Sequence, residues 1–339
     1  MNIEDKLIDL KIFHKRRKTF VNLTDEQKEA VKNFNERIQN SQIPMEEVKC
    51  LCKNDKFSLI GSVDRYGFIQ STVICTKCGL VQSNPRMTSA YYKYFYGSDE
   101  YRKLYGGNKF IYDYEKFYSE GRGDAIYQSI IEHKSLEDIK SVLEFGAAGG
   151  WNLVPFVKQG ISVRGYDYSK ELVKLGNKKG INLVHGSIEA IDGSYDVIIA
   201  NHVIEHLTNF INDIKKLREH LNPAGIMFVG VPDIAKFSMA HLQNAHTYHF
   251  SLKTLQYYME QCGLKMIHHQ PETGGHLSAI FIKADHQEDA SIIWNHYDEM
   301  SKMLRRYNRA YYPRYLLVKC LELLRLKNST KRILNYFNK

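Results

Sequence analysis

Three side chains that can move a proton or hold a metal stand close together after one apolar run. His202, Glu205 and His206 follow residues 195–200. Positions i, i+3 and i+4 share one face of a helix, so we expect the three groups to converge if a helical turn begins here. A histidine has a pKa near neutrality and can serve there as a general base.

Four cysteines, Cys50, Cys52, Cys75 and Cys78, form a second set with a chemical signature. Thiolates on two knuckles are the ligand set of tetrahedral zinc, and a site of four cysteines leaves no open position for catalysis. The first pair is Cys-x-Cys, one residue shorter than Cys-x-x-Cys, so its two sulfurs lie closer together and would bind one metal ion with strain. We expect structural zinc on a small antiparallel ribbon over residues 47–87, with an empty thiol ribbon and a disulfide as open alternatives.

A turn of small residues from Gly146 to Gly150 separates the apolar run 141–145 from a helical pattern that begins at Asn152. Such a turn lets a ligand lie against backbone N–H groups at a helix start, although it also serves plain strand-to-helix packing. Asp167 ends the next apolar run, about twenty residues beyond the first glycine. An acid at that position can reach ribose hydroxyls from the neighbouring strand.

The elements that must position these groups alternate between strand and helix. Strands are expected at 141–145, 161–166, 181–185, 195–200 and 226–231, with an antiparallel pair at 264–269 and 276–283. This alternation predicts an α/β fold with a doubly wound, seven-stranded Rossmann-like sheet. Ligands of such a sheet lie at the carboxyl ends of its strands.

Five segments carry a family resemblance in their order and spacing: LEFGAAGG, GYDYS, GSIEAI, YDVIIANHVIEHL and HTYHFSLKTLQYYMEQCGL. Over residues 141–284 they resemble the successive motifs of class I S-adenosylmethionine-dependent methyltransferases, although the third small position of the loop is alanine here. The resemblance implies S-adenosyl-L-methionine as cofactor. It implies cofactor contacts from ten residues: Glu144, Gly146, Ala147, Ala148, Gly150, Asp167, Tyr168, Ser187, Ile188 and Asn201.

The resemblance also implies three alternative roles for the polar cluster. In the first, His206 is the general base and Glu205 orients it or the substrate, as in sugar methyltransferases. In the second, His202, Glu205, His206 and His246 hold a divalent metal, similar to the Glu-x-x-Glu-His motif of quinone O-methyltransferases. In the third, Glu205 and His206 cap a helix and pack against the cofactor loop.

The cysteine segment, as far as CGLVQSNPRM, resembles the zinc-binding ribbon of sugar C-methyltransferases and related polysaccharide-cluster enzymes. We therefore expect a methyltransferase that modifies a sugar, nucleotide-sugar or bacterial polysaccharide precursor. O-methylation is favoured because the segment after residue 284 is shorter than the extra domain of the C-methyltransferases. Two alternatives are a tRNA or rRNA methyltransferase and a non-catalytic cofactor-binding module. Against the first, the sequence contains no Asn/Asp-Pro-Pro-aromatic motif for amino-group methylation.

The flanking segments are expected to be helical. Residues 1–46 hold a Thr24/Gln27 capping box and a basic cluster at 14–18, either a solvated face or a polyanion contact. Residues 88–140 are a tyrosine-rich linker or lid, with glycine hinges at 106–107 and 121–123. Residues 285–339 form a basic tail. Its leucine stripe would contact the body, a second subunit or a membrane surface; it comprises Leu316, Leu317, Leu321 and Leu324.

Composition sets wider limits on the function. The 339 residues are 43% hydrophobic and 12% aromatic, enough for two domains with apolar cores. The net charge of +9 is compatible with an acidic partner but does not select one. No apolar run approaches the roughly twenty residues that span a bilayer, and the N-terminal charge order is the reverse of a signal peptide. We therefore expect a cytoplasmic protein, whose thiols stay reduced.

Overall fold

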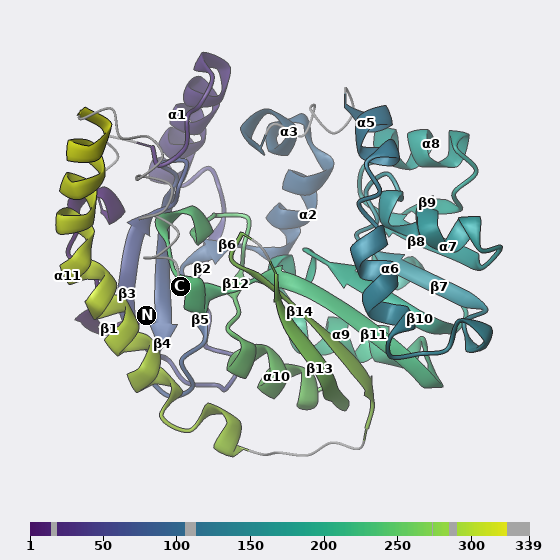
Figure 1. Ribbon diagram of the computed structural model, residues 1–339. Coiled ribbons are helices and arrows are strands. Elements are labelled where there is room, and N and C mark those ends of the chain that lie inside the picture. The colour runs from purple at the N-terminus through teal and green to yellow at the C-terminus, as the bar shows by residue number, and fades with distance from the viewer. Residues whose placement is uncertain (15–18, 106–112, 273, 285–289, 324–339) are drawn as a thin grey trace.

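Two β-sheets and their covering helices make up the structure, a computed structural model that describes residues 1–14, 19–105, 113–272, 274–284 and 290–323 (Figure 1). The larger sheet has seven strands in the order β13-β14-β11-β10-β7-β8-β9. Its strands are β7 (Ser141–Phe145), β8 (Ser162–Asp167), β9 (Leu183–His185), β10 (Tyr195–Asn201), β11 (Leu221–Pro232), β13 (Leu264–Glu272) and β14 (His276–Lys283). The five strands from β11 to β9 are parallel, and β13 and β14 are antiparallel, which confirms the predicted doubly wound sheet.

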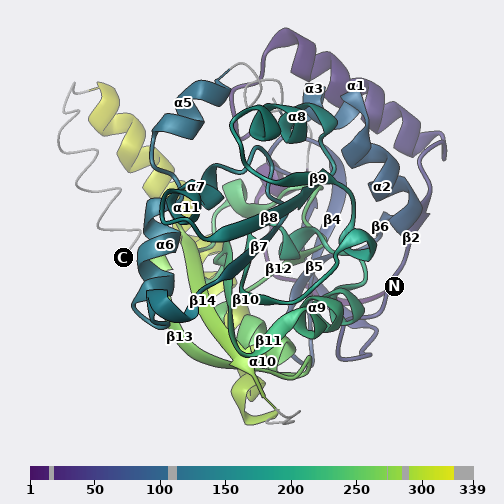
Figure 2. The same cartoon turned by 90° about the vertical axis from the view of Figure 1, so that its right-hand side faces the viewer.

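Side chains of the central strands alternate between two apolar layers. On β7, Val142 packs with the helices on one face and Leu143 with those on the other. Strands buried on both faces are nearly continuous apolar runs, which is why the sequence located them. The first layer contains α6 (Asp124–Ile131), α7 (Val154–Lys158) and part of α8 (Lys170–Lys178); the second contains α9 (Phe210–Glu219) and α10 (Leu252–Glu260) (Figure 2).

The cysteine segment belongs to a sheet larger than the predicted ribbon. Its five strands have the order β1-β3-β4-β5-β12, with bounds Asn2–Lys6, Lys56–Val63, Ile69–Cys75, Val81–Ser83 and Tyr248–His249. We call it the Cys sheet. Strand β12 pairs with β5 of the Cys sheet, but in the chain it lies between β11 of the larger sheet and the helix α10. The segment between β11 and α10 therefore connects the two sheets. The strands of the segment 47–87, where we expected a small antiparallel ribbon, thus belong to a sheet that also includes β1 and β12.

The N-terminal segment begins with a strand where we expected helix. β1 pairs in parallel with β3, and all five of its side chains are exposed. Because none of its side chains is buried, it carries no apolar alternation that could reveal a strand. The predicted capping box of Thr24 and Gln27 is confirmed and begins α1 (Asp25–Gln39). Gln27 N donates to Thr24 Oγ1 at 3.2 Å, and Thr24 N donates to Gln27 Oε1 at 3.0 Å.

Further helices connect and cover the sheets. α2 (Ser89–Gly97), α3 (Asp99–Tyr105) and α5 (Tyr114–Ser119) lie in the tyrosine-rich segment, and β2 (Met45–Glu46) pairs with β6 (Arg86–Met87). The predicted C-terminal helix is α11 (His296–Leu323), which runs along the Cys sheet and packs Met300 and Leu304 against it (Figure 1).

Several predicted features lie outside the described residues. These are the basic residues 15–18, the glycine pair 106–107 and Leu324, and also the side chains of Leu317 and Leu321. Leu316 is described and its side chain is exposed. None of the described helices is long and apolar enough to cross a bilayer.

Candidate active site

The turn after β10 differs from the helical turn that we expected. His202 has a left-handed backbone with φ 54°, held by a hydrogen bond from its N–H to Gly230 O at 2.8 Å. A 3₁₀ turn then covers Ile204–His206. His202 lies before this turn and has a left-handed backbone, so the helical turn that would place the three residues on one face does not form.

Glu205 is buried between these histidines. Its Oε1 lies 3.5 Å from His202 Nδ1, and its Oε2 has no hydrogen-bond partner among the described residues. Burial raises the pKa of Glu205, but the bond to His202 and the charges of both histidines outweigh burial and hold it below its usual value. Burial lowers the pKa of His202, and the hydrogen bond and charge of Glu205 reverse that effect, so the His202 pKa is raised. His202 and Glu205 thus tend toward an ion pair.

His206 is oriented by the loop that precedes β12 and by the tyrosine-rich segment. Its Nδ1 lies 2.9 Å from Ala245 O and 3.0 Å from the Tyr96 hydroxyl, which itself donates to Ala245 O at 2.8 Å. A carbonyl oxygen can only accept, so Nδ1 carries the proton and Nε2 carries the lone pair. This is the tautomer that a general base needs.

The predicted residue His246 does join the cluster. Its ring centroid lies 4.8 Å from that of His206 and 5.5 Å from that of His249. Burial, followed by the charge of His206, lowers the pKa of His246 well below its usual value, and its Nδ1 has no described partner. One ligand atom each from Glu205, His206 and His246 lies within 4.8 Å of the others. The structure therefore groups three of the four proposed metal ligands and leaves His202 outside.

The loop that carries His246 is held by residues that we did not single out in the sequence. Thr247 N donates to Glu205 O at 2.9 Å, and Ser83 Oγ on the Cys sheet donates to His246 O at 2.7 Å. Asp64 accepts from Asn244 N at 2.9 Å. Burial raises the pKa of Asp64 to about 7, although hydrogen bonds from three backbone N–H groups lower it. No sequence motif marks these contacts, because each joins segments far apart in the chain.

The turn of small residues has the geometry of a ligand-binding loop. Gly146 has φ +75°, and a Cβ there would lie 2.8 Å from Val203 Cγ2. Ala148 has φ 47°, so the residue that departs from the family pattern adopts a left-handed conformation. Gly149, which we did not select, has no room for a Cβ beside Tyr114 of α5, and the Tyr114 hydroxyl donates to Gly149 O at 3.0 Å. α5 therefore packs directly on the loop.

Two carboxylates flank this loop. Asp167 accepts from Ala148 N and Ser169 N, both at 2.8 Å, one on each oxygen. Each oxygen keeps a lone pair for a further donor. Glu144 accepts from Asn152 Nδ2 at 2.6 Å, and its Oε2 is buried without a described partner. Burial raises the pKa of Glu144 to about 8.

The remaining predicted cofactor positions lie along the carboxyl edge of the same sheet. Tyr168 directly follows β8 and is 37% exposed, and Ile188 is buried beyond β9. Ser187 Oγ donates to Glu189 Oε2 at 2.5 Å. Asn201 ends β10 and lies over Gly230, where its Oδ1 leaves no room for a Cβ. Ala147 is buried inside the loop.

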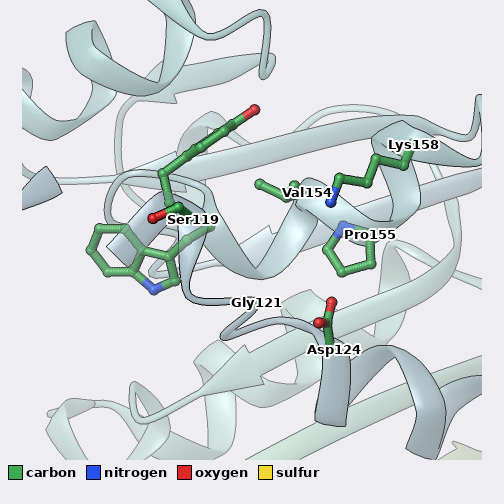
Figure 3. A pocket seen from close by; sticks show the side chains of 8 residues that line it. Ser119, Gly121, Asp124, Val154, Pro155 and Lys158 are labelled. Atoms are coloured by element: carbon green, nitrogen blue, oxygen red, sulfur yellow. The ribbon is translucent and has the colours of Figure 1, made fainter. Parts of the chain in front are cut away.

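The cavity shown in Figure 3 has a volume of about 360 Å³. It is lined by α5, α7 and the start of α6, through Tyr118, Ser119, Gly121, Asp124, Trp151, Val154, Pro155 and Lys158. None of the predicted site residues lines it. We expected Gly123 to be a hinge. In the structure it packs closely against the backbone of Asn152, since a Cβ at Gly123 would lie 2.6 Å from Asn152 O.

The four cysteines converge as the sequence predicts. Their sulfur atoms lie within 4.8 Å of one another, with Cys50 and Cys78 3.5 Å apart and Cys52 and Cys75 3.6 Å apart. These separations are far longer than a disulfide bond, and all four cysteines are free. Tetrahedral zinc with bonds of about 2.3 Å places its sulfurs about 3.8 Å apart, so the set fits zinc with small adjustments.

Comparison with known proteins finds similarity over part of the larger sheet and its helices. Residues 122–269 match the family model described as a methyltransferase domain. The ubiquinone biosynthesis O-methyltransferase of Rickettsia prowazekii is 32% identical over 103 residues, which cover 28% of this chain and 41% of that protein.

One further protein sequence and one solved structure are similar to parts of the chain. An uncharacterised protein of Methanocaldococcus jannaschii is 29% identical over 135 residues, 38% of this chain and 62% of that protein. The structure of Burkholderia thailandensis 1,6-didemethyltoxoflavin-N1-methyltransferase has 16% identity and a TM-score of 0.48, covering 64% of this chain and 96% of that one. The chain spans about half the length of the curated relatives that it matches.

Proposed function

We propose that the protein is an S-adenosylmethionine-dependent methyltransferase that O-methylates a hydroxylated acceptor, with His206 as the general base. The observation that carries the proposal is the bond between His206 Nδ1 and Ala245 O at 2.9 Å, because it leaves the lone pair on Nε2. The match to a methyltransferase domain model and the small-residue loop beside Asp167 support the cofactor.

The cofactor would supply a methyl group on a positively charged sulfur, held over the loop at Gly146 by backbone N–H groups and by Asp167. His206 Nε2 would take the proton from the acceptor hydroxyl as its oxygen bonds to the methyl carbon and the carbon–sulfur bond breaks. Glu205 would stabilise the imidazolium that forms, since its carboxylate lies beside both histidines. Ala245 O and the Tyr96 hydroxyl keep the ring fixed during the transfer.

For the acceptor we propose a sugar, nucleotide-sugar or polysaccharide precursor. The support is the resemblance of the cysteine segment to the ribbons of carbohydrate-modifying methyltransferases, together with four free thiols that converge in the structure. We propose structural zinc at these cysteines. The nucleic-acid alternative predicts a tight complex with tRNA, which a gel shift would detect.

The test of the proposed base is His206→Gln. We expect turnover, measured as release of S-adenosylhomocysteine with a panel of nucleotide-sugars, to fall roughly 100-fold or more. Binding of S-adenosylhomocysteine should be retained, because the hydrogen bonds of the His206 ring go to Ala245 O and the Tyr96 hydroxyl. His269→Gln is the matched control, since His269 is exposed on β13. Near-normal turnover of His206→Gln would assign the residue to packing alone.

A second candidate mechanism is supported by one observation, the grouping of Glu205, His206 and His246. A carboxylate and two imidazoles form a ligand set for a divalent cation, which would bind two neighbouring hydroxyls of an acceptor. The similarity to ubiquinone biosynthesis O-methyltransferases fits such an acceptor. Turnover by zinc-loaded protein that stops with a chelator and returns with added Mg²⁺ would favour this mechanism. Turnover that is indifferent to Mg²⁺ would favour the general base.

A further inference from the structure

The cysteine cluster receives a hydrogen bond from outside its own sheet. Tyr258, on α10 beside the larger sheet, directs its hydroxyl to Cys78 Sγ at 3.1 Å and lies 3.8 Å from Cys50 Sγ. The ring is 2% exposed, and the described residues offer this hydroxyl no acceptor other than sulfur. A buried phenol normally has a good acceptor. A neutral thiol is a weak acceptor and a metal-bound thiolate a strong one, so the contact suits a cluster that holds a metal.

The chain that follows Cys78 contacts the loop that carries His246. β5 begins three residues after Cys78 and pairs with β12, in the register Val81 to His249. On β5, Ser83 donates its hydroxyl to His246 O at 2.7 Å and its N–H to Thr247 O at 3.0 Å. The chain then continues from β12 into α10, which carries Tyr258. The segment 246–258 is thus fastened to the Cys sheet at both ends.

Cys75 Sγ has a donor from the cysteine segment itself. Asn54 Nδ2 lies 3.3 Å from Cys75 Sγ, and its residue sits between the first knuckle and β3. Tyr258 therefore differs from Asn54 in one respect: its hydrogen bond connects the cluster to a helix that covers the larger sheet. Outer-shell partners of this kind orient metal ligands and tune the metal.

We propose that Tyr258 is an outer-shell hydrogen-bond donor to the metal-bound Cys78 thiolate, and that this bond couples metal binding to the position of the segment 246–258. Zinc here would do more than close a small sheet. It would hold α10 and the loop of His246 in place for the active site. The proposal rests on the zinc site proposed above and is independent of methyl transfer.

The experiment compares the wild type with Tyr258→Phe, which keeps the ring and removes the donor. We expect zinc affinity, measured by chelator competition, to fall roughly 10- to 100-fold. In the cobalt(II)-substituted protein, the thiolate-to-metal charge-transfer band should move to longer wavelength, since the sulfur loses a hydrogen bond. Hydrogen exchange should show zinc-dependent protection of residues 246–258 in the wild type and less in the variant.

Tyr195→Phe is the control, because Tyr195 is a buried phenol of the same apolar cluster whose hydroxyl interacts with Tyr166. It should leave zinc affinity and the cobalt spectrum unchanged. A Tyr258→Phe protein with wild-type affinity and spectrum would reduce Tyr258 to a packing role and overturn the proposal. A wild type that binds neither zinc nor cobalt would overturn it as well. All three readouts work without substrate, so they do not depend on the proposed reaction.

Discussion

The cofactor loop can be tested with two glycines that share a backbone conformation but differ in surroundings. Gly146 has φ +75° and Gly160 has φ +72°. An alanine at either position must adopt a left-handed conformation, which costs about 1–2 kcal/mol. At Gly160 nothing lies within 4 Å of the added Cβ, whereas at Gly146 it would lie 2.8 Å from Val203 Cγ2. Overpacking of this kind adds roughly 1–3 kcal/mol.

We expect both variants to lower the free energy of unfolding by about 1–2 kcal/mol, the cost of the left-handed conformation. Gly146→Ala should relieve the overpacking in the free protein by moving the loop away from Val203. Because the loop must return to bind the cofactor, the overpacking cost of about 1–3 kcal/mol appears in binding instead and weakens S-adenosylhomocysteine roughly 5- to 150-fold.

The assays are urea denaturation for stability and titration calorimetry for S-adenosylhomocysteine binding. Gly160→Ala should bind like the wild type, because Gly160 lies in the exposed turn between α7 and β8. Equal affinity of the two variants would refute the reasoning, since it would show that the bend at Gly146 does not support the ligand. A loss in both would indicate that general destabilisation, and not the loop, weakens binding.

Three further outcomes are expected. Asp167→Ala should abolish binding of S-adenosylhomocysteine in calorimetry, and unchanged binding would remove Asp167 from the ribose. Folding raises the pKa of Glu144 from 4.5 to about 8, so the folded protein keeps a proton that the unfolded chain releases. Wild-type stability should therefore fall relative to Glu144→Gln as pH rises between these values, and parallel urea midpoints of the two proteins would contradict this. Elemental analysis should find one zinc per chain at the four cysteines, and its removal should lower the melting temperature; a metal-free, equally stable preparation would contradict the zinc site.

Much of the larger sheet was predictable because its signals are local. Buried parallel strands are short apolar runs, and the turn at Gly146 and the acid at Asp167 occupy fixed places relative to them. The antiparallel pair β13 and β14 and the helix α11 were predictable for the same reason. The β1 strand was not, because its exposed side chains follow no apolar pattern and its pairing with β3 joins segments far apart in the chain.

The arrangement of the active-site cluster depended on details that the sequence does not encode locally. Spacing alone suggested that His202, Glu205 and His206 share a face if a helical turn begins there, but His202 has a left-handed backbone and only residues 204–206 form a 3₁₀ turn. Which tyrosine meets the cluster was also open, and the structure selects Tyr96.

The sequence by itself determined the identity of the chemical groups and the order of the elements that carry them. It placed the small-residue loop, the acids, the histidines and the cysteines at strand ends, because periodicity and turn residues are properties of neighbouring positions. Only the tertiary structure decided which groups touch. The pairing of β12 with β5 and the bond from Tyr258 to Cys78 join residues far apart in the chain. Such contacts follow from how two sheets pack together, which neighbouring residues do not reveal.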